Sequence, residues 1–163
     1  MSLTAHPMTT TLHLTTTAFT PGEEIPGTFT CDGSDASPAL KWNAPPSGTQ
    51  CFALVVDDPD APRGTWVHWV LWNLAATERE LPEGVPPHGQ LSSGARQGRN
   101  DFGKIGYGGP CPPPGAPHRY FFRLYALDKT LTLGAGATRA QLDRAMRSHI
   151  LAQAEVMGLY RRR

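Results

Sequence analysis

Two short segments of the chain hold the side chains that could carry out chemistry. The first, DDPDAPRGTWVHW at residues 57–69, places Asp58 and Asp60 on a proline-containing turn, a few residues before His68. A carboxylate accepts hydrogen bonds, and its negative charge favours the protonated form of a nearby imidazole. The prolines restrict the turn, and Pro62 allows a cis peptide bond. These residue types on a rigid turn are typical of a site that binds a charged ligand or transfers a proton.

The second segment, GYGGPCPPPGAPHRY at residues 106–120, combines a stiff backbone with several hydrogen-bond donors. Gly109 allows close approach of the backbone and offers its N–H to an anionic oxygen, and Pro110 then fixes the direction of the chain. His118 and Tyr120 add side-chain donors for a phosphate or carboxylate oxygen. The carboxylate of the first segment is instead an acceptor, which could face an ammonium group or hold a histidine in its protonated form. The mixture favours a zwitterionic ligand over a simple anion.

Two strands are expected to position these segments. The runs Val67–Leu74 and Tyr120–Leu127 are rich in aromatic and β-branched residues, and side chains alternate between the two faces of a strand. The alternation places His68 on one face with Val70, Trp72 and Leu74, and His118 on one face with Tyr120, Phe122 and Leu124. If the polar ends of the two strands are neighbours, they form a small pocket with an apolar floor and a polar mouth.

The rest of the chain predicts a mainly all-β fold. Four further runs read as strands: Thr11–Thr15, Gly27–Cys31, Leu40–Trp42 and Phe52–Val56. Residues 82–117 are rich in glycine and proline, and we expect an ordered loop there rather than a disordered linker. At 163 residues, the chain is expected to form a single domain over residues 1–163.

One long helix is predicted near the C-terminus, from Arg139 to Met157. Thr138 and Gln141 form a capping box at its start, and Gly158 is a suitable stop. The apolar residues Leu142, Met146, Ile150, Ala154 and Met157 follow at helical spacing.

Composition excludes several classes of function. Only 18% of residues are charged and the net charge is +1, so the concentrated basic face of a nucleic-acid-binding protein is not expected. The sequence has no secretory signal and no apolar run long enough to span a bilayer, which predicts a cytoplasmic protein without an integral membrane segment. The three cysteines include no C-x-x-C pair, so neither a metal nor a cofactor is predicted. Cytoplasmic thiols are normally reduced, but the sequence does not exclude a disulfide between Cys31 and Cys111.

The order of the motifs resembles one protein family. D-P-D-A-P, W-x-H-W, G-P-C-P-P and H-R-Y follow one another, and T-C-D-G…S-P at residues 30–38 and G-R-N-D-F-G at residues 98–103 add to the likeness. The chain resembles the phosphatidylethanolamine-binding protein family, in its bacterial and archaeal Raf-kinase-inhibitor-like branch. The resemblance implies a Greek-key β-sandwich with a large central antiparallel sheet and a smaller sheet, to which the predicted C-terminal helix is added.

The resemblance also implies a pocket for the phosphate of a phosphoethanolamine-type head group. Carried over motif by motif, its ligand-binding residues are Asp58, Asp60, Pro62, Trp66, His68, Gly109, Pro110, His118 and Tyr120. From the residues alone, Asp60 fits a turn-forming aspartate better than a ligand contact. Trp66 fits a pocket wall and simple packing equally well.

Three functions compete at this point. The first is a non-enzymatic protein that binds a small anion or phospholipid head group, with the kinase- or protease-inhibitory role that the resemblance implies. The second is a hydrolase-type enzyme that uses His68, His118, Asp58 and Cys111 as base, orienting acid and nucleophile. The third is a protein-interaction module that recognises a phosphorylated or carboxylate group. The resemblance also makes a homodimer plausible.

Overall fold

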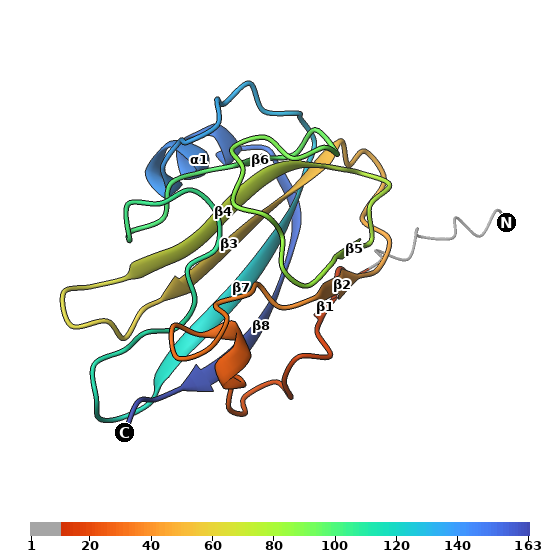
Figure 1. Cartoon of the computed structure of the whole chain (residues 1–163). Helices are drawn as coiled ribbons and strands as arrows, with labels where there is room; N and C mark the ends of the chain where they lie inside the picture. Colours follow the sequence, from red (N-terminus) through yellow and green to blue (C-terminus); the bar gives the residue numbers. More distant parts are fainter. Residues whose placement is uncertain (1–10) are drawn as a thin grey trace, which may run out of the picture.

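The computed structural model describes residues 11–163 as two antiparallel sheets and one short α-helix (Figure 1). The larger sheet has the strand order β6-β4-β3-β7-β8, and the smaller sheet has the order β1-β2-β5. The strands of the larger sheet are β3 (Cys51–Asp58), β4 (Trp66–Ala75), β6 (Arg96–Gln97), β7 (His118–Leu127) and β8 (Ile150–Tyr160). Those of the smaller sheet are β1 (Leu14–Thr15), β2 (Leu40–Trp42) and β5 (Glu80–Leu81). The helix α1 spans Arg139–Met146. The mainly all-β sandwich predicted from the sequence is confirmed.

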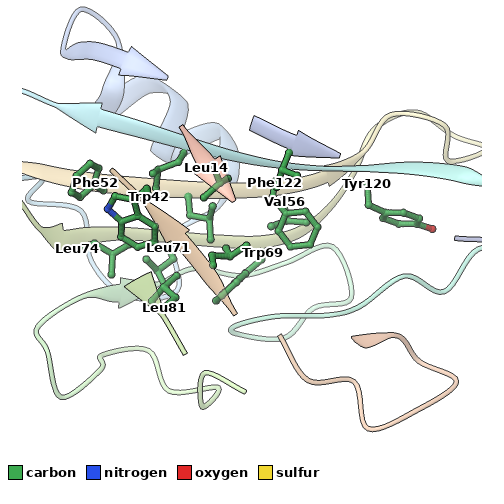
Figure 2. Packing of buried hydrophobic residues seen from close by; sticks show 14 of the residues in the cluster. Leu14, Trp42, Phe52, Val56, Trp69, Leu71, Leu74, Leu81, Tyr120 and Phe122 are labelled. Atoms are coloured by element: carbon green, nitrogen blue, oxygen red, sulfur yellow. The ribbon is translucent and has the colours of Figure 1, made fainter. Parts of the chain in front are cut away.

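The larger sheet is buried on its inner face and, over β3 and β4, on its outer face as well. Its inner face, which we define as the face toward the smaller sheet, packs Phe52, Leu54 and Phe122 against Leu14 and Trp42 (Figure 2). Its outer face is covered by α1, with a second cluster that contains these residues: Val55, Val70, Trp72, Leu142 and Met146. Because every residue of β3 is buried, this strand reads in the sequence as a continuous apolar run.

The predicted long helix is wrong in its second half. The helix α1 ends at Met146, Ser148 adopts a positive φ of 69°, and the chain then forms β8. β8 pairs with β7 along its whole length, from His118 opposite Tyr160 to Leu127 opposite Ile150. The apolar residues at helical spacing also fit an alternating pattern, and the hydrogen bonds to β7 decide in favour of the strand.

One smaller expectation also fails. Residues 27–31 do not form a strand, because Gly27–Phe29 is a single 3-10 turn. Within residues 11–163 no peptide bond is cis, so the bond before Pro62 is trans.

Residues 82–117 follow a defined path that includes β6, and Cys31 is joined to Cys111 by a disulfide. In the described part of the chain, no helix has the length and apolar character needed to span a membrane.

Three strand ends that matter for function lie at the same end of the larger sheet. Asp58, the last residue of β3, pairs with Trp66, the first residue of β4. β7 begins beside them, because Asp57 pairs with Phe121. In Figure 1 the β3–β4 turn, the start of β7 and the C-terminus lie together at this end. The two chemistry-bearing segments of the sequence therefore meet there.

Candidate functional site

A β-bulge in β4 turns His68 toward the inner face. Val56 pairs with Trp69 and Asp57 pairs with Val67, so His68 is an extra residue on β4 with no counterpart on β3. A bulge of this kind re-aims a side chain and is common next to functional sites. The imidazole of His68 lies edge-on to the ring of Tyr120, with 5.2 Å between the ring centres.

Simple alternation had placed His68 with Val70, Trp72 and Leu74, and that prediction is wrong. Val70 and Trp72 lie on the outer face, among the residues under α1. Leu74 lies on the inner face, because a second register shift separates the pairs at Phe52 and Leu54. The prediction for His118, Tyr120, Phe122 and Leu124 is confirmed: the last three belong to the inner cluster, and the ring of His118 stacks on Tyr120 at the end of the same face.

A cavity of about 200 Å³ lies at this end of the inner face. Six of the nine residues named from the sequence line it: Asp58, Pro62, Trp66, His68, His118 and Tyr120. The other lining residues are Ala61, Phe102, Cys111, Pro112 and Pro113. The cavity therefore has polar groups from β3, β4 and β7, and a wall made by the proline-rich loop.

Asp58 and His118 form an ion pair or charged hydrogen bond on one side of the cavity. Nδ1 of His118 lies 2.7 Å from Oδ2 of Asp58, and the side chain of Asp58 is almost fully buried. Oδ1 of Asp58 accepts the backbone N–H of Asp60 at 2.8 Å. Both carboxylate oxygens of Asp58 thus accept a hydrogen bond from the protein, and one of these contacts holds the ring of His118.

Tyr120 presents an unsatisfied polar group beside this pair. Its side chain is buried, and its hydroxyl makes no hydrogen bond within the described residues. Figure 2 shows the ring at the end of the apolar cluster, with the hydroxyl directed away from the leucine and tryptophan side chains. Burial, then the negative charge of Asp58 and the proximity of its carboxylate oxygens, raise the pKa of Tyr120 well above its ordinary value, although the two groups do not meet the geometry of a hydrogen bond. The hydroxyl therefore stays protonated and remains a donor.

His68 is held by the backbone of the loop. Its Nδ1–H donates to the carbonyl oxygen of Gly108 at 2.6 Å, and the N–H of Gly108 donates to the carbonyl oxygen of His68 at 2.9 Å. Because a carbonyl only accepts, Nδ1 carries the proton, and in the neutral ring Nε2 is an acceptor. Burial lowers the pKa of His68 below its ordinary value, although the Gly108 carbonyl and the Asp58 charge oppose this effect. The empty site therefore favours a neutral His68.

Three of the nine predicted site residues do not line the cavity, and Asp60 is the first of them. Asp60 holds the β3–β4 turn against β7. Its carboxylate accepts two side-chain hydrogen bonds from Arg119, each 2.9 Å long, and also the Arg119 backbone N–H. This paired geometry is specific to a guanidinium and a carboxylate. Asp60 thus supports the turn that carries Ala61 and Pro62 into the cavity wall.

Gly109 and Pro110 also lie outside the cavity lining. The N–H of Gly109 donates to Oδ1 of Asp35 at 2.8 Å, so it is not free for a ligand. A Cβ at Gly109 would overlap the carbonyl oxygen of Phe29, which explains the need for glycine at this position. The carbonyl of Pro110 accepts the N–H of Cys31 at 3.1 Å. These residues anchor the loop to residues 29–35.

Sequence reasoning missed the aromatic side chain of Phe102. Its ring lies edge-on to Trp66 and to His68, with centre-to-centre distances of 5.5 and 5.3 Å. Phe102 and Trp66 are both exposed, at 40% and 37%, and they form the mouth of the cavity. An exposed phenylalanine inside the G-R-N-D-F-G loop was the available signal.

The arrangement limits the chemistry at the site. Cys111 has no free thiol because it is bonded to Cys31, and no serine or threonine lines the cavity. The hydrolase hypothesis thereby loses the nucleophile that it assumed. Among residues 11–163, no group of three or more histidine, cysteine or acidic side chains is arranged to hold a metal ion. The remaining capacity is that of hydrogen bonding and proton exchange by His68, His118 and Tyr120.

The fold and this cavity define a ligand-binding protein of the antiparallel β-sandwich class. The chain belongs to the phosphatidylethanolamine-binding protein family, whose model matches residues 15–161. Proteins called UPF0098 protein are 48% identical over 151 residues in Methanothermobacter thermautotrophicus and 50% identical over 147 residues in Aquifex aeolicus. These matches cover 93% and 89% of this chain, and 99% and 85% of the relatives.

Two solved structures are similar throughout. A phosphatidylethanolamine-binding protein homologue from Chlamydia trachomatis is 41% identical with a TM-score of 0.85, and the match covers 94% of this chain and 99% of that one. YbcL of E. coli, described as a member of the mammalian PEBP family, is 34% identical with a TM-score of 0.87, covering 93% and 99%. The resemblance inferred from the motifs is confirmed.

Proposed function

We propose that the cavity binds a small anion of the phosphate or phosphomonoester class, including a phosphoethanolamine-type head group. The observation that carries this proposal is the buried hydroxyl of Tyr120, which has no hydrogen-bond partner within residues 11–163. An unsatisfied buried donor costs about 1–3 kcal/mol, and a ligand oxygen in the cavity would recover that energy. His68 and His118 line the same cavity.

The charged groups that line the cavity favour an anion whose binding is accompanied by proton uptake. With both histidines neutral, the ionised carboxylate of Asp58 would repel a negative ligand. A proton on His118 neutralises Asp58 through their 2.7 Å contact, and a proton on His68 converts Nε2 from an acceptor to a donor. Binding is therefore coupled to protonation of His68.

The contacts of Asp58 argue against the position that the sequence suggested for the ammonium group of a zwitterionic ligand. The side chain of Asp58 is almost fully buried and already accepts from His118 and from the N–H of Asp60, so we place the ammonium contact elsewhere. The exposed rings of Trp66 and Phe102 at the mouth offer a cation–π surface instead. A zwitterionic head group would place its phosphate inside and its ammonium at this mouth.

Calorimetry with inorganic phosphate, phosphoethanolamine and acetate tests the proposal. We expect Tyr120→Phe and His68→Gln each to weaken phosphate binding by about tenfold or more, because a hydrogen bond to a charged group contributes roughly 1.5–3 kcal/mol. Tyr125→Phe is the matched control, since Tyr125 lies on the same strand but packs against the outer cluster. If both cavity variants bind phosphate as tightly as the unaltered protein, the site is assigned to the wrong residues.

A second candidate rests on the exposed aromatic mouth. Trp66 and Phe102 would contact a partner protein whose phosphate or carboxylate group occupies the cavity, and a kinase- or protease-inhibitory role would act in this way. A phosphopeptide that binds more tightly than free phosphate, and loses this advantage in Trp66→Ala, would support the candidate. An equal affinity for the two ligands would refute it.

A further inference from the structure

The Cys31–Cys111 disulfide lies in the wall of the cavity and is open to solvent. Cys111, Pro112 and Pro113 line the cavity, and Cys31 belongs to a loop 80 residues earlier in the sequence. Both cysteines are exposed, whereas the third, Cys51, is a buried free thiol. A soluble thiol can therefore reach the disulfide without unfolding of the chain.

The disulfide is the central attachment of this wall. Upstream, the N–H groups of Gly108 and Gly109 are bound by His68 and Asp35. Downstream, the N–H of Gly115 donates to the carbonyl of Arg162 at 3.3 Å. Between these anchors, the carbonyl of Pro110 accepts the N–H of Cys31, Pro112 and Pro113 have no N–H to donate, and the side chain of Cys111 is covalently tied to Cys31. Loss of the covalent bond would free the part of the loop that faces a ligand.

Charge near the disulfide favours one direction of cleavage. Nη1 of Arg162 lies 3.8 Å from Sγ of Cys111, and Nη2 lies 3.2 Å from the carboxylate of Asp32. A neighbouring guanidinium stabilises a thiolate, so Cys111 is the better leaving group. The carboxylate of Asp32 is paired with Arg162 and Tyr160, and that of Asp35 accepts the N–H of Gly109, which limits their repulsion of an incoming thiolate.

We propose that the Cys31–Cys111 disulfide is a redox switch that an external dithiol opens to weaken ligand binding in the adjoining cavity. One thiolate of the dithiol attacks Sγ of Cys31 and forms a mixed disulfide, while the bond to Cys111 breaks and its electron pair remains on Cys111 as a thiolate. The second thiol of the dithiol, as its thiolate, then displaces Cys31. The dithiol leaves as an internal disulfide, having supplied two electrons. The effect on affinity rests on the proposed anion-binding function, but the exchange reaction does not.

The first arm of the test follows the thiols in the folded, full-length protein. The protein is incubated with dithiothreitol at low millimolar concentration without denaturant, alkylated with iodoacetamide and analysed by peptide mass. We expect Cys31 and Cys111 to be labelled together while buried Cys51 stays unlabelled. Arg162→Gln should slow reduction by at least about threefold, and the neighbouring Arg163→Gln should not. Reduction of the disulfide only under conditions that also expose Cys51 would overturn the proposal.

The second arm measures phosphate affinity in the oxidised, reduced and reoxidised protein. We expect reduction to weaken binding by about tenfold, the equivalent of ordering the backbone of roughly one additional residue on binding. Reoxidation should restore the affinity. The double variant Cys31→Ser/Cys111→Ser should bind like the reduced protein and ignore dithiothreitol, and Cys51→Ala should behave like the unaltered protein. Equal affinities of the oxidised and reduced forms would overturn the switch.

A third readout separates failure of the switch from failure of the proposed function. If the oxidised protein binds no phosphate, the anion-binding function is wrong, and the switch is judged by hydrogen exchange of the Gly108, Gly109, Cys111 and Gly115 amides. Reduction must then accelerate exchange at these amides with the rest of the sheet unchanged. Unchanged exchange in this loop would overturn the proposal in that case as well.

Discussion

Anion binding at His68 should depend on pH in a direction that the structure fixes. Burial lowers the pKa of His68 below its ordinary value of 6.5, so the empty protein keeps this ring neutral near pH 7. An anion next to Nε2 favours the charged ring and raises the pKa in the complex. Binding therefore takes up a proton, and affinity should rise as the pH falls.

The size of the effect follows from charge and distance. An anion about 4 Å from the imidazolium gains about 4 kcal/mol at an effective dielectric constant of about 20, which is enough to reverse the effect of burial on the pKa of His68. Between the lowered pKa of the empty protein and the raised pKa of the complex, uptake of one proton changes the dissociation constant by about tenfold per pH unit. The empty protein itself should lose stability as the pH falls below about 6.5, because its unfolded chain then binds the proton more readily.

Sulfate is the appropriate probe, since its own charge does not change between pH 6 and pH 8. Calorimetry at several pH values gives the dissociation constant, and titrations in two buffers with different ionisation enthalpies give the number of protons taken up. His68→Gln is the matched variant, because an amide N–H can still donate to the Gly108 carbonyl. We expect the proton count to fall by one in this variant and the pH slope to fall with it.

Two results would refute the reasoning. One is sulfate binding by the unaltered protein with an affinity that is constant from pH 8 to pH 6. The other is a His68→Gln variant that binds sulfate with the same pH slope as the unaltered protein. Either would mean that His68 is not the group whose protonation is coupled to the ligand.

Three further variants test separate parts of the structure. Tyr120→Phe removes a buried hydroxyl without a described partner, so we expect urea unfolding to show a gain of about 1 kcal/mol even though phosphate binding weakens. Asp57→Asn should lower the free energy of unfolding by about 2 kcal/mol, because it leaves the guanidinium groups of Arg123 and Arg139 without their buried carboxylate. The control is Glu155→Gln, which removes an exposed ion pair and should change stability by less than about 0.5 kcal/mol. Gly109→Ala forces a Cβ onto the Phe29 carbonyl and should lower the free energy of unfolding by about 2–3 kcal/mol. The control Gly27→Ala has open space for its Cβ and should cost less than about 0.5 kcal/mol. Equal urea midpoints for these two variants would contradict the packing argument.

Strong local patterns in the sequence were sufficient to predict most of the central sheet. Residues 51–56 of β3 form an uninterrupted apolar run, and β7 alternates buried apolar residues with partly exposed ones that include Arg119 and Arg123. The region of α1 and β8 could not be resolved in this way, because residues 150–157 fit both periodicities. Val156 is buried in the sheet, and Gly158 lies so close to Ile25 and Phe19 that a Cβ would overlap them. Those contacts depend on segments more than a hundred residues away, which a local pattern does not contain.

The candidate site shows the same division between motif and geometry. The motifs identified Asp58, His118 and Tyr120, which line the cavity in the structure. They could not give the orientation of His68, because alternation holds only in a regular strand and a bulge reverses it. They also could not show that the Gly109 N–H is taken by Asp35, a residue 74 positions earlier.

The cavity collects groups that each lower the stability of the empty protein. His68 is buried with a pKa that burial lowers, the Tyr120 hydroxyl has no partner among the described residues, and a bulge interrupts the pairing of β3 and β4. In a chain selected for stability alone, an apolar side chain at position 120 and regular pairing at position 68 would cost less free energy. A single anion with several oxygens would compensate the hydroxyl and the imidazole together, since both adjoin the same 200 Å³. Binding sites commonly contain several locally unfavourable features that a single ligand would compensate. The three features found here meet at one cavity, and together they support an anion there more strongly than any one residue does.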